Sequence, residues 1–155
     1  MHLWTPTSYY ILEHGAVRLA NGDSPEVYWN DQWTPICGHY FWDNHDGANL
    51  FCQELGFSSG VVSSGLWGDS KRKNIELEFD AIRIGQCEAN DKWLNCTGGC
   101  NDLATGGHCP GNFNAKCSAG DLSGITIECL ASKYHNYYNR FLAFFTPVPQ
   151  SPYHS

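Results

Sequence analysis

The stretch WDNHDGANLFCQELGF, residues 42–57, contains the clearest helix signal in this sequence. Four apolar residues recur at spacings of three and four, so they share one helix face: Ala48, Phe51, Cys52 and Leu55. Gly56 follows as a stop signal. The residues whose side chains can cap the start are Asp43, Asn44 and Asp46. We therefore predict one short helix that buries Cys52 in the core.

Strand signals precede this helix. Residues 16–19 alternate between apolar and polar side chains, as a half-buried strand does. Residues 26–29 and 32–36 predict a hairpin, closed by the Asn-Asp pair between them. Pro35 cannot donate a hydrogen bond to a neighbouring strand, so its strand is expected at a sheet edge or at a bulge.

Irregular segments separate the strand signals that follow the helix. Residues 57–74 are rich in Gly and Ser and predict a long loop, and residues 97–120 show almost no periodicity. Residues 75–79 alternate strictly and predict a strand that continues as an extended segment to residue 84. Residues 125–129 predict the last strand. The fold class expected is α+β with the sheet dominant.

Composition limits the classes of partner. The net charge is −7, whereas a nucleic-acid surface needs a basic excess. The basic run Lys71–Lys73 is expected to be a solvated turn. The sequence lacks a run of eighteen apolar residues, so no membrane span is predicted. Residues 1–15 lack the apolar core of a signal peptide, so either the signal has been removed or this is a segment of a larger precursor.

Eight cysteines in 155 residues indicate disulfides and an oxidising compartment. Eight cysteines allow about 105 pairings, and the sequence alone does not choose among them. A zinc site is the alternative, because thiolates and histidine suit zinc. The residues that would supply it lie close in sequence: Cys96, Cys100, His108, Cys109 and Cys117. Their spacing matches no common zinc motif, so disulfides are favoured.

Signals for catalysis are weak, and we expect no enzyme. The chain contains no Gly-x-Ser-x-Gly motif and no free cysteine with a plausible histidine partner. Glu76 and Glu78 alternate along the predicted strand 75–79, which is typical of a solvated strand face. No catalytic residue is therefore assigned.

The order of these motifs resembles the scavenger receptor cysteine-rich (SRCR) domain family. Trp42-Asp43 and Cys52–Phe57 resemble the family's helix with its Leu-Gly stop, and Trp93–Cys96 resembles the end of its small disulfide loop. The other matching segments, in chain order, are Val17–Gly22, Glu26–Tyr28, Asp31–Trp33, Ile36-Cys37, Ala48-Asn49, Asp80–Arg83 with Cys87, and Cys117, Asp121, Gly124 and Cys129. The resemblance runs in colinear order from about residue 15 to about residue 130. It implies a curved antiparallel β-sheet cradling one α-helix, rich in disulfides and long loops.

Disulfide pairing follows from the resemblance, which implies Cys37–Cys117, Cys52–Cys129 and Cys87–Cys96. The remaining pair, Cys100–Cys109, then lies in a loop where the family has no additional cysteines. The usual short cysteine-bearing segment between the first two strands is missing here, and one residue is inserted between residues 42 and 52.

A divalent-cation site is a further implication of the resemblance, and calcium is its candidate ion. Four aspartates fall where the family tends to place such a cluster: Asp43, Asp46, Asp91 and Asp121. Of these, Asp43 and Asp121 match the family's acidic positions, and Asp43, Asp46 and Asp121 are the candidate ligands. The family often has two acids directly after the cysteine at position 37, and here these are Gly38 and His39. Helix capping and turn formation explain the same aspartates, so we expect weak calcium dependence or none.

Two features stand apart from the core of the resemblance. Asn95-Cys96-Thr97 fits the N-glycosylation acceptor pattern, with a neighbouring disulfide that crowds it. The segments before and after the domain are rich in aromatic residues. These residues either cover the domain itself or dock onto a neighbouring subunit: Trp4, Tyr9, Tyr10, Tyr134, Tyr137, Tyr138, Phe141, Phe144 and Phe145.

The expected organisation is an N-terminal extension at 1–14, an SRCR-like domain at 15–130 and a C-terminal extension, aromatic and rich in proline, at 131–155. The expected function is extracellular, non-catalytic recognition or adhesion, with protein or glycan ligands and without nucleic acid. The alternative is a structural subunit of an extracellular polymer that assembles through the aromatic extensions.

Overall fold

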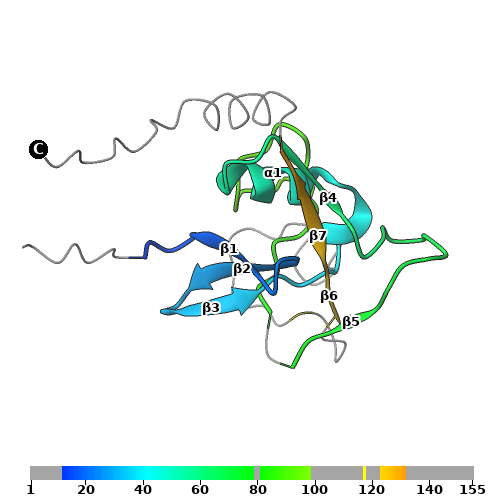
Figure 1. Ribbon diagram of the computed structural model, residues 1–155, viewed down its shortest axis with the longest axis horizontal. Helices are drawn as coiled ribbons and strands as arrows, with labels where there is room; N and C mark the ends of the chain where they lie inside the picture. Colours follow the sequence, from blue (N-terminus) through cyan, green and yellow to red (C-terminus); the bar gives the residue numbers. More distant parts are fainter. Residues whose placement is uncertain (1–11, 79–80, 99–116, 118–122, 132–155) are drawn as a thin grey trace, which may run out of the picture.

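The computed structural model describes residues 12–78, 81–98, 117 and 123–131 (Figure 1). Within them lie one α-helix, α1 (Asp46–Glu54), one short 3-10 helix, η1 (Phe41–Asp43), and seven short strands. All the strand pairs are antiparallel. The structure is thus a small disulfide-bonded α+β domain. The predicted extensions at either end lie outside the described residues, apart from residues 12–14 and 131.

The first sheet is an up-and-down ribbon of β1 (Val17–Ala20), β2 (Ser24–Trp29) and β3 (Gln32–Pro35). The β2–β3 turn puts Asn30 and Asp31 at φ 48° and 62°, the left-handed conformations that match the twist of a two-residue hairpin. This hairpin confirms the prediction. β3 lies at the edge of its sheet, which is the position expected for a strand that contains Pro35.

Two further ladders replace the single curved sheet that was expected. β4 (Ser59–Val62) pairs with β7 (Ile127–Leu130), and β5 (Ile75–Glu76) pairs with β6 (Ser123–Gly124). The prediction of a continuous loop from 57 to 74 was wrong, because β4 lies inside it. The strand predicted over residues 75–79 is only two residues long.

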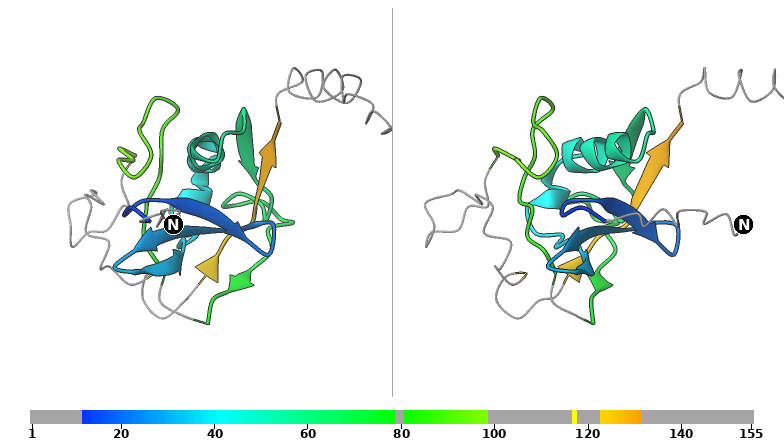
Figure 2. Two further views of the ribbon diagram at one scale, coloured as in Figure 1. Left: turned by 60° about the vertical axis from the view of Figure 1, so that its left-hand side comes forward. Right: turned by 90° about the vertical axis from the view of Figure 1, so that its left-hand side faces the viewer.

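Helix α1 packs mainly against β4 and lies above the three-stranded sheet (Figure 2). The N-cap position is His45, whose side chain makes no capping bond, but Asn44 just before it satisfies the first helical N–H: its Oδ1 accepts a hydrogen bond from the Asp46 N–H at 2.9 Å. His45 joins the helix start to β4, since its Nδ1 accepts from the Val62 N–H at 3.1 Å. Gly56 ends the helix with φ 89°, as the sequence predicts.

The core lies between α1, the inner face of the three-stranded sheet and the β4–β7 ladder. Its fully buried side chains come from distant parts of the chain and include Val27, Ile36, Phe41, Phe51, Ile82 and Ile127. Gly60 brings β4 close to the helix, because a Cβ there would meet Cys52 and would lie 2.6 Å from the Ala48 oxygen. A small residue is therefore required where β4 crosses α1.

Three disulfides join these elements. Cys37–Cys117 and Cys52–Cys129 span 80 and 77 residues, and Cys87–Cys96 closes a loop of 9 residues. They are the three pairs that the resemblance implies within the described residues, and no cysteine described there is free. Zinc binding by Cys96 and Cys117 is incompatible with these bonds. Cys100 and Cys109 lie outside the described residues.

Candidate functional site

The residues considered for a cation site do not gather into one within the described part of the chain. No group there of three or more His, Cys, Asp or Glu side chains could hold a metal ion, and Asp121 lies outside it. Asp43 ends η1 and is half-buried; burial raises its carboxyl pKa above the ordinary value, and the nearby His39 partly offsets this. Asp46 starts α1, where its backbone N–H donates to the Asn44 Oδ1.

Gly38 and His39 occupy the two positions where the family often has acids. Gly38 is buried, and a Cβ on it would meet the Trp42 ring and lie 2.9 Å from the Gly124 oxygen. His39 lies against the same Trp42 ring, with ring centroids 4.8 Å apart. The backbone at residue 38 therefore has no space for a carboxylate side chain.

Asp91 organises the loop closed by Cys87–Cys96. Its carboxylate accepts hydrogen bonds from the Glu88 N–H at 2.8 Å and from the Thr97 N–H and hydroxyl at 2.8 and 2.7 Å. Desolvation raises its pKa, but these three hydrogen bonds outweigh it, so the pKa lies below the ordinary value. Asp91 thus has the turn-forming role that was weighed against cation binding. Asn95 is exposed in the same loop, beside the bonded Thr97.

We expect Asp91→Ala to lower the free energy of unfolding by about 1–2 kcal/mol, because it removes three hydrogen bonds to a carboxylate. The loss is no larger because these bonds are exposed to solvent, which weakens each of them. The stabilisation by Asp91 is complete above about pH 4 and is lost as the pH falls through its lowered folded pKa. Urea unfolding of wild type and variant at neutral and acidic pH measures this. A difference between the two proteins that grows below pH 4 would contradict the assignment.

The basic run Lys71–Lys73 is not merely a solvated turn, because Arg72 is half-buried against two indole rings. Its guanidinium carbon lies 4.4 Å from the Trp42 ring centroid and 5.2 Å from that of Trp67. The two indoles are nearly parallel, at 10°, with centroids 5.8 Å apart. Trp42 is 3% exposed and Trp67 is 64% exposed. We call Trp42, Trp67 and Arg72 the Trp–Arg stack.

Backbone hydrogen bonds hold the loop that carries the stack. The Trp67 N–H donates to the Trp42 oxygen at 3.0 Å, and the Lys73 N–H donates to the Ser64 oxygen at 2.7 Å. Gly65 adopts φ 98°, and its α-carbon faces the Arg72 backbone so closely that a Cβ would lie 2.8 Å from the Arg72 Cα. The exposed indole is therefore presented on a fixed loop rather than on a free side chain.

This stack was not predicted from the sequence. Trp67 and Arg72 were each visible, but Trp42 is 25 residues before Trp67 and belongs to a different element. The signal that could have pointed to it is a Trp and an Arg within a loop rich in Gly and Ser.

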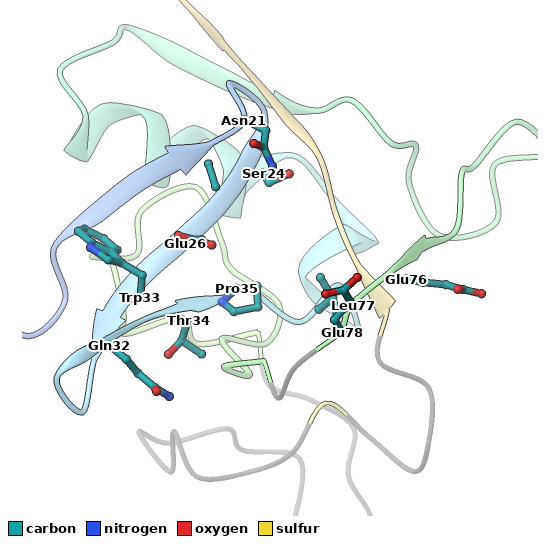
Figure 3. Close-up of a pocket in the computed structure, with 11 residues that line it drawn as sticks. Asn21, Ser24, Glu26, Gln32, Trp33, Thr34, Pro35, Glu76, Leu77 and Glu78 are labelled. Atoms are coloured by element: carbon teal, nitrogen blue, oxygen red, sulfur yellow. The ribbon is translucent and has the colours of Figure 1, made fainter.

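A groove of about 560 Å³ lies over the outer face of the three-stranded sheet (Figure 3). Residues 32–35 of β3 line one part of it and residues 76–78 another, and Glu26 on the neighbouring strand β2 lines it as well. Arg18 neutralises Glu26 at 2.6 Å and lies 4.4 Å above the Trp33 ring. None of the described lining residues is a histidine or a cysteine, and Ser24 donates to Asp23. These side chains offer contacts but no nucleophile with an adjacent base.

The remaining predicted site residues lie outside the described part of the chain. They are Cys100 and Cys109, and the aromatic residues of the extensions, Trp4, Tyr9, Tyr10, Tyr134, Tyr137, Tyr138, Phe141, Phe144 and Phe145.

None of the helices in the described part of the chain has the length and hydropathy needed to cross a membrane.

Comparison with known proteins gives one partial relative. Over 85 residues the chain is 34% identical to macrophage receptor MARCO of Mus musculus. The match covers 51% of this chain and 16% of that receptor, so the chain spans only a small part of its relative's length. No protein-family model matches the chain, and no solved structure matches it. The similarity is to a receptor rather than to an enzyme.

Proposed function

We propose that this chain is a recognition module of the SRCR type that acts outside the cell, without catalysis, by binding protein or glycan ligands. Similarity to a macrophage receptor supports ligand binding. Three disulfides are typical of an oxidising, extracellular or cell-surface location. The motifs that resemble SRCR domains include all six cysteines of these bonds.

The observation that carries the proposal is the exposed Trp67 of the Trp–Arg stack. Trp67 is 64% exposed, and exposing a large apolar ring to water is unfavourable. Packing of the core does not require an indole at this position. Trp and Arg are the residue types that most often dominate the binding energy of recognition surfaces. A fixed loop also lowers the entropy lost when a ligand binds. The polymer alternative rests on the extensions outside the described residues, so we propose recognition alone.

Binding of the folded, oxidised chain to panels of immobilised glycans and extracellular proteins tests the proposal. We expect a discrete set of ligands, and we expect Trp67→Ala to reduce binding to them by about tenfold or more. Trp33→Ala, which removes an indole on the outer sheet face, is the matched control and should retain binding. If the panel binds neither wild type nor variants, the proposed function is wrong. If Trp67→Ala binds as wild type does, the assigned surface is wrong.

A further inference from the structure

We infer that the Trp–Arg stack binds a sugar ring that carries a carboxylate group, as in the acidic residue of a glycan. This inference rests on the proposed function and names the ligand class for the same surface.

The exposed indole supplies the surface for the ring. Trp67 lies parallel to Trp42, so one face of its ring is supported from behind by a second, buried indole. One face of a pyranose is formed by C–H groups, and such an apolar face stacks on a flat aromatic ring whose edge remains in water. The exposed Trp67 indole, rather than the buried Trp42, therefore offers the flat platform for one sugar ring.

Arg72 supplies a cation at this platform. Its guanidinium lies over both indoles, which fixes the orientation of the planar group. Nη1 is buried without a hydrogen-bond partner among the described residues. A buried Nη1 does not reach an external ligand, so the edge of the guanidinium formed by Nε and Nη2 is the one that pairs with a carboxylate through two hydrogen bonds.

The charges around the stack favour an external anion. The chain has sixteen acidic residues against nine basic ones, yet within the described residues neither Lys71, Arg72 nor Lys73 forms an ion pair. Two nearby carboxylates have other partners: the Oδ1 atom of Asp69 accepts a hydrogen bond from the Lys71 backbone N–H, and Asp43 lies beside His39. The three cations of this loop are thus available to a ligand. A neutral sugar would leave them unused, and a small anion without a ring would leave Trp67 unused.

The test is a titration of the 15N-labelled, oxidised chain with methyl β-D-glucuronide, followed through the indole N–H signals. The chain has six tryptophans, and the Trp67 signal is assigned from its absence in Trp67→Phe. We expect a saturable shift of this signal. Methyl β-D-glucoside, which lacks the charge, and acetate, which lacks the ring, should each bind at least about tenfold more weakly, since either loses one of two contacts.

Variants separate the contributions of the two groups. Arg72→Lys keeps the charge but loses the planar pair of donors, and we expect it to weaken glucuronide binding by about tenfold. Lys92→Ala, which removes an exposed lysine of the small disulfide loop, is the control and should bind as wild type does. The indole spectrum of each variant verifies that it is folded.

Three results would overturn the inference: no saturable shift with glucuronide, acetate as effective as glucuronide, or full binding by Arg72→Lys. If any of these occurs while panel ligands still bind the chain, the ligand class is wrong and the proposed recognition function stands. If the panel also gives no ligand, both fail.

Discussion

Removal of the Cys52–Cys129 disulfide by Cys52→Ala with Cys129→Ala is expected to lower the free energy of unfolding by about 3.5 kcal/mol. A disulfide stabilises chiefly by reducing the conformational entropy of the unfolded chain, and a loop of 77 residues alone would give about 4.5 kcal/mol. The two long disulfides interleave, however. Cys37 precedes Cys52 by 15 residues, and Cys117 precedes Cys129 by 12. With Cys37–Cys117 intact, the shortest chain path that joins Cys52 to Cys129 in the unfolded protein is therefore only about 27 residues, and closing it costs less entropy.

Urea unfolding of the oxidised proteins measures this effect. The matched control is Cys87→Ala with Cys96→Ala, which opens a loop of 9 residues and should cost about 2.5 kcal/mol. Cys52 is fully buried at the crossing of α1 and β4, so its alanine variant also loses packing against Gly60. A larger loss from the small-loop variant than from the Cys52–Cys129 variant would contradict this account.

The parts of the fold that could be predicted are those set by local interactions. The β2–β3 hairpin follows from two short alternating segments around Asn30-Asp31, whose left-handed conformations need no distant partner. The helix follows from its apolar spacing and from Gly56. Both signals lie within about a dozen residues, so the sequence alone contains them.

The elements that could not be predicted depend on contacts between distant residues. β4 lies in a segment rich in Gly and Ser and becomes a strand because β7, 65 or more residues later, pairs with it and because His45 accepts the Val62 N–H. The short β5 shows the reverse case, since the alternating pattern continues to residue 79 but the pairing described with β6 stops at Glu76. Local periodicity overestimates one strand and misses the other for the same reason.

The Trp–Arg stack could not be predicted from the sequence for the same reason. A run of Lys-Arg-Lys on its own indicates a solvated turn. Arg72 differs from an ordinary solvated arginine because two indole rings lie next to it. Trp42 is held in the core by η1, and the Trp67 N–H is hydrogen-bonded to the Trp42 oxygen. The pairing of cation and indoles is a property of the tertiary structure.

Gly38→Asp, which restores an acid that the resembling family often has, is expected to lower the free energy of unfolding by about 3–5 kcal/mol. Gly38 lies in a tight place: its N–H donates to the Ser123 oxygen at 2.8 Å, and its own oxygen accepts from the Trp42 N–H at 3.0 Å. Any side chain would collide with the Trp42 ring, and a carboxylate would also be buried without a cationic partner. Adding calcium should not restore the loss, because the displaced ring and backbone rather than a missing ion cause it.

The control for this variant is His39→Asp at the adjacent position, which is only half-buried, so that its carboxylate can reach water. We expect it to cost about 1 kcal/mol, mainly through the lost contact with the Trp42 ring. Urea unfolding of both variants, with and without millimolar calcium, gives the comparison. If calcium stabilises Gly38→Asp more than it stabilises wild type, the acid has entered a working cation site. The steric explanation for Gly38 would then be wrong, and Asp43 and Asp46 would be its first candidate ligands.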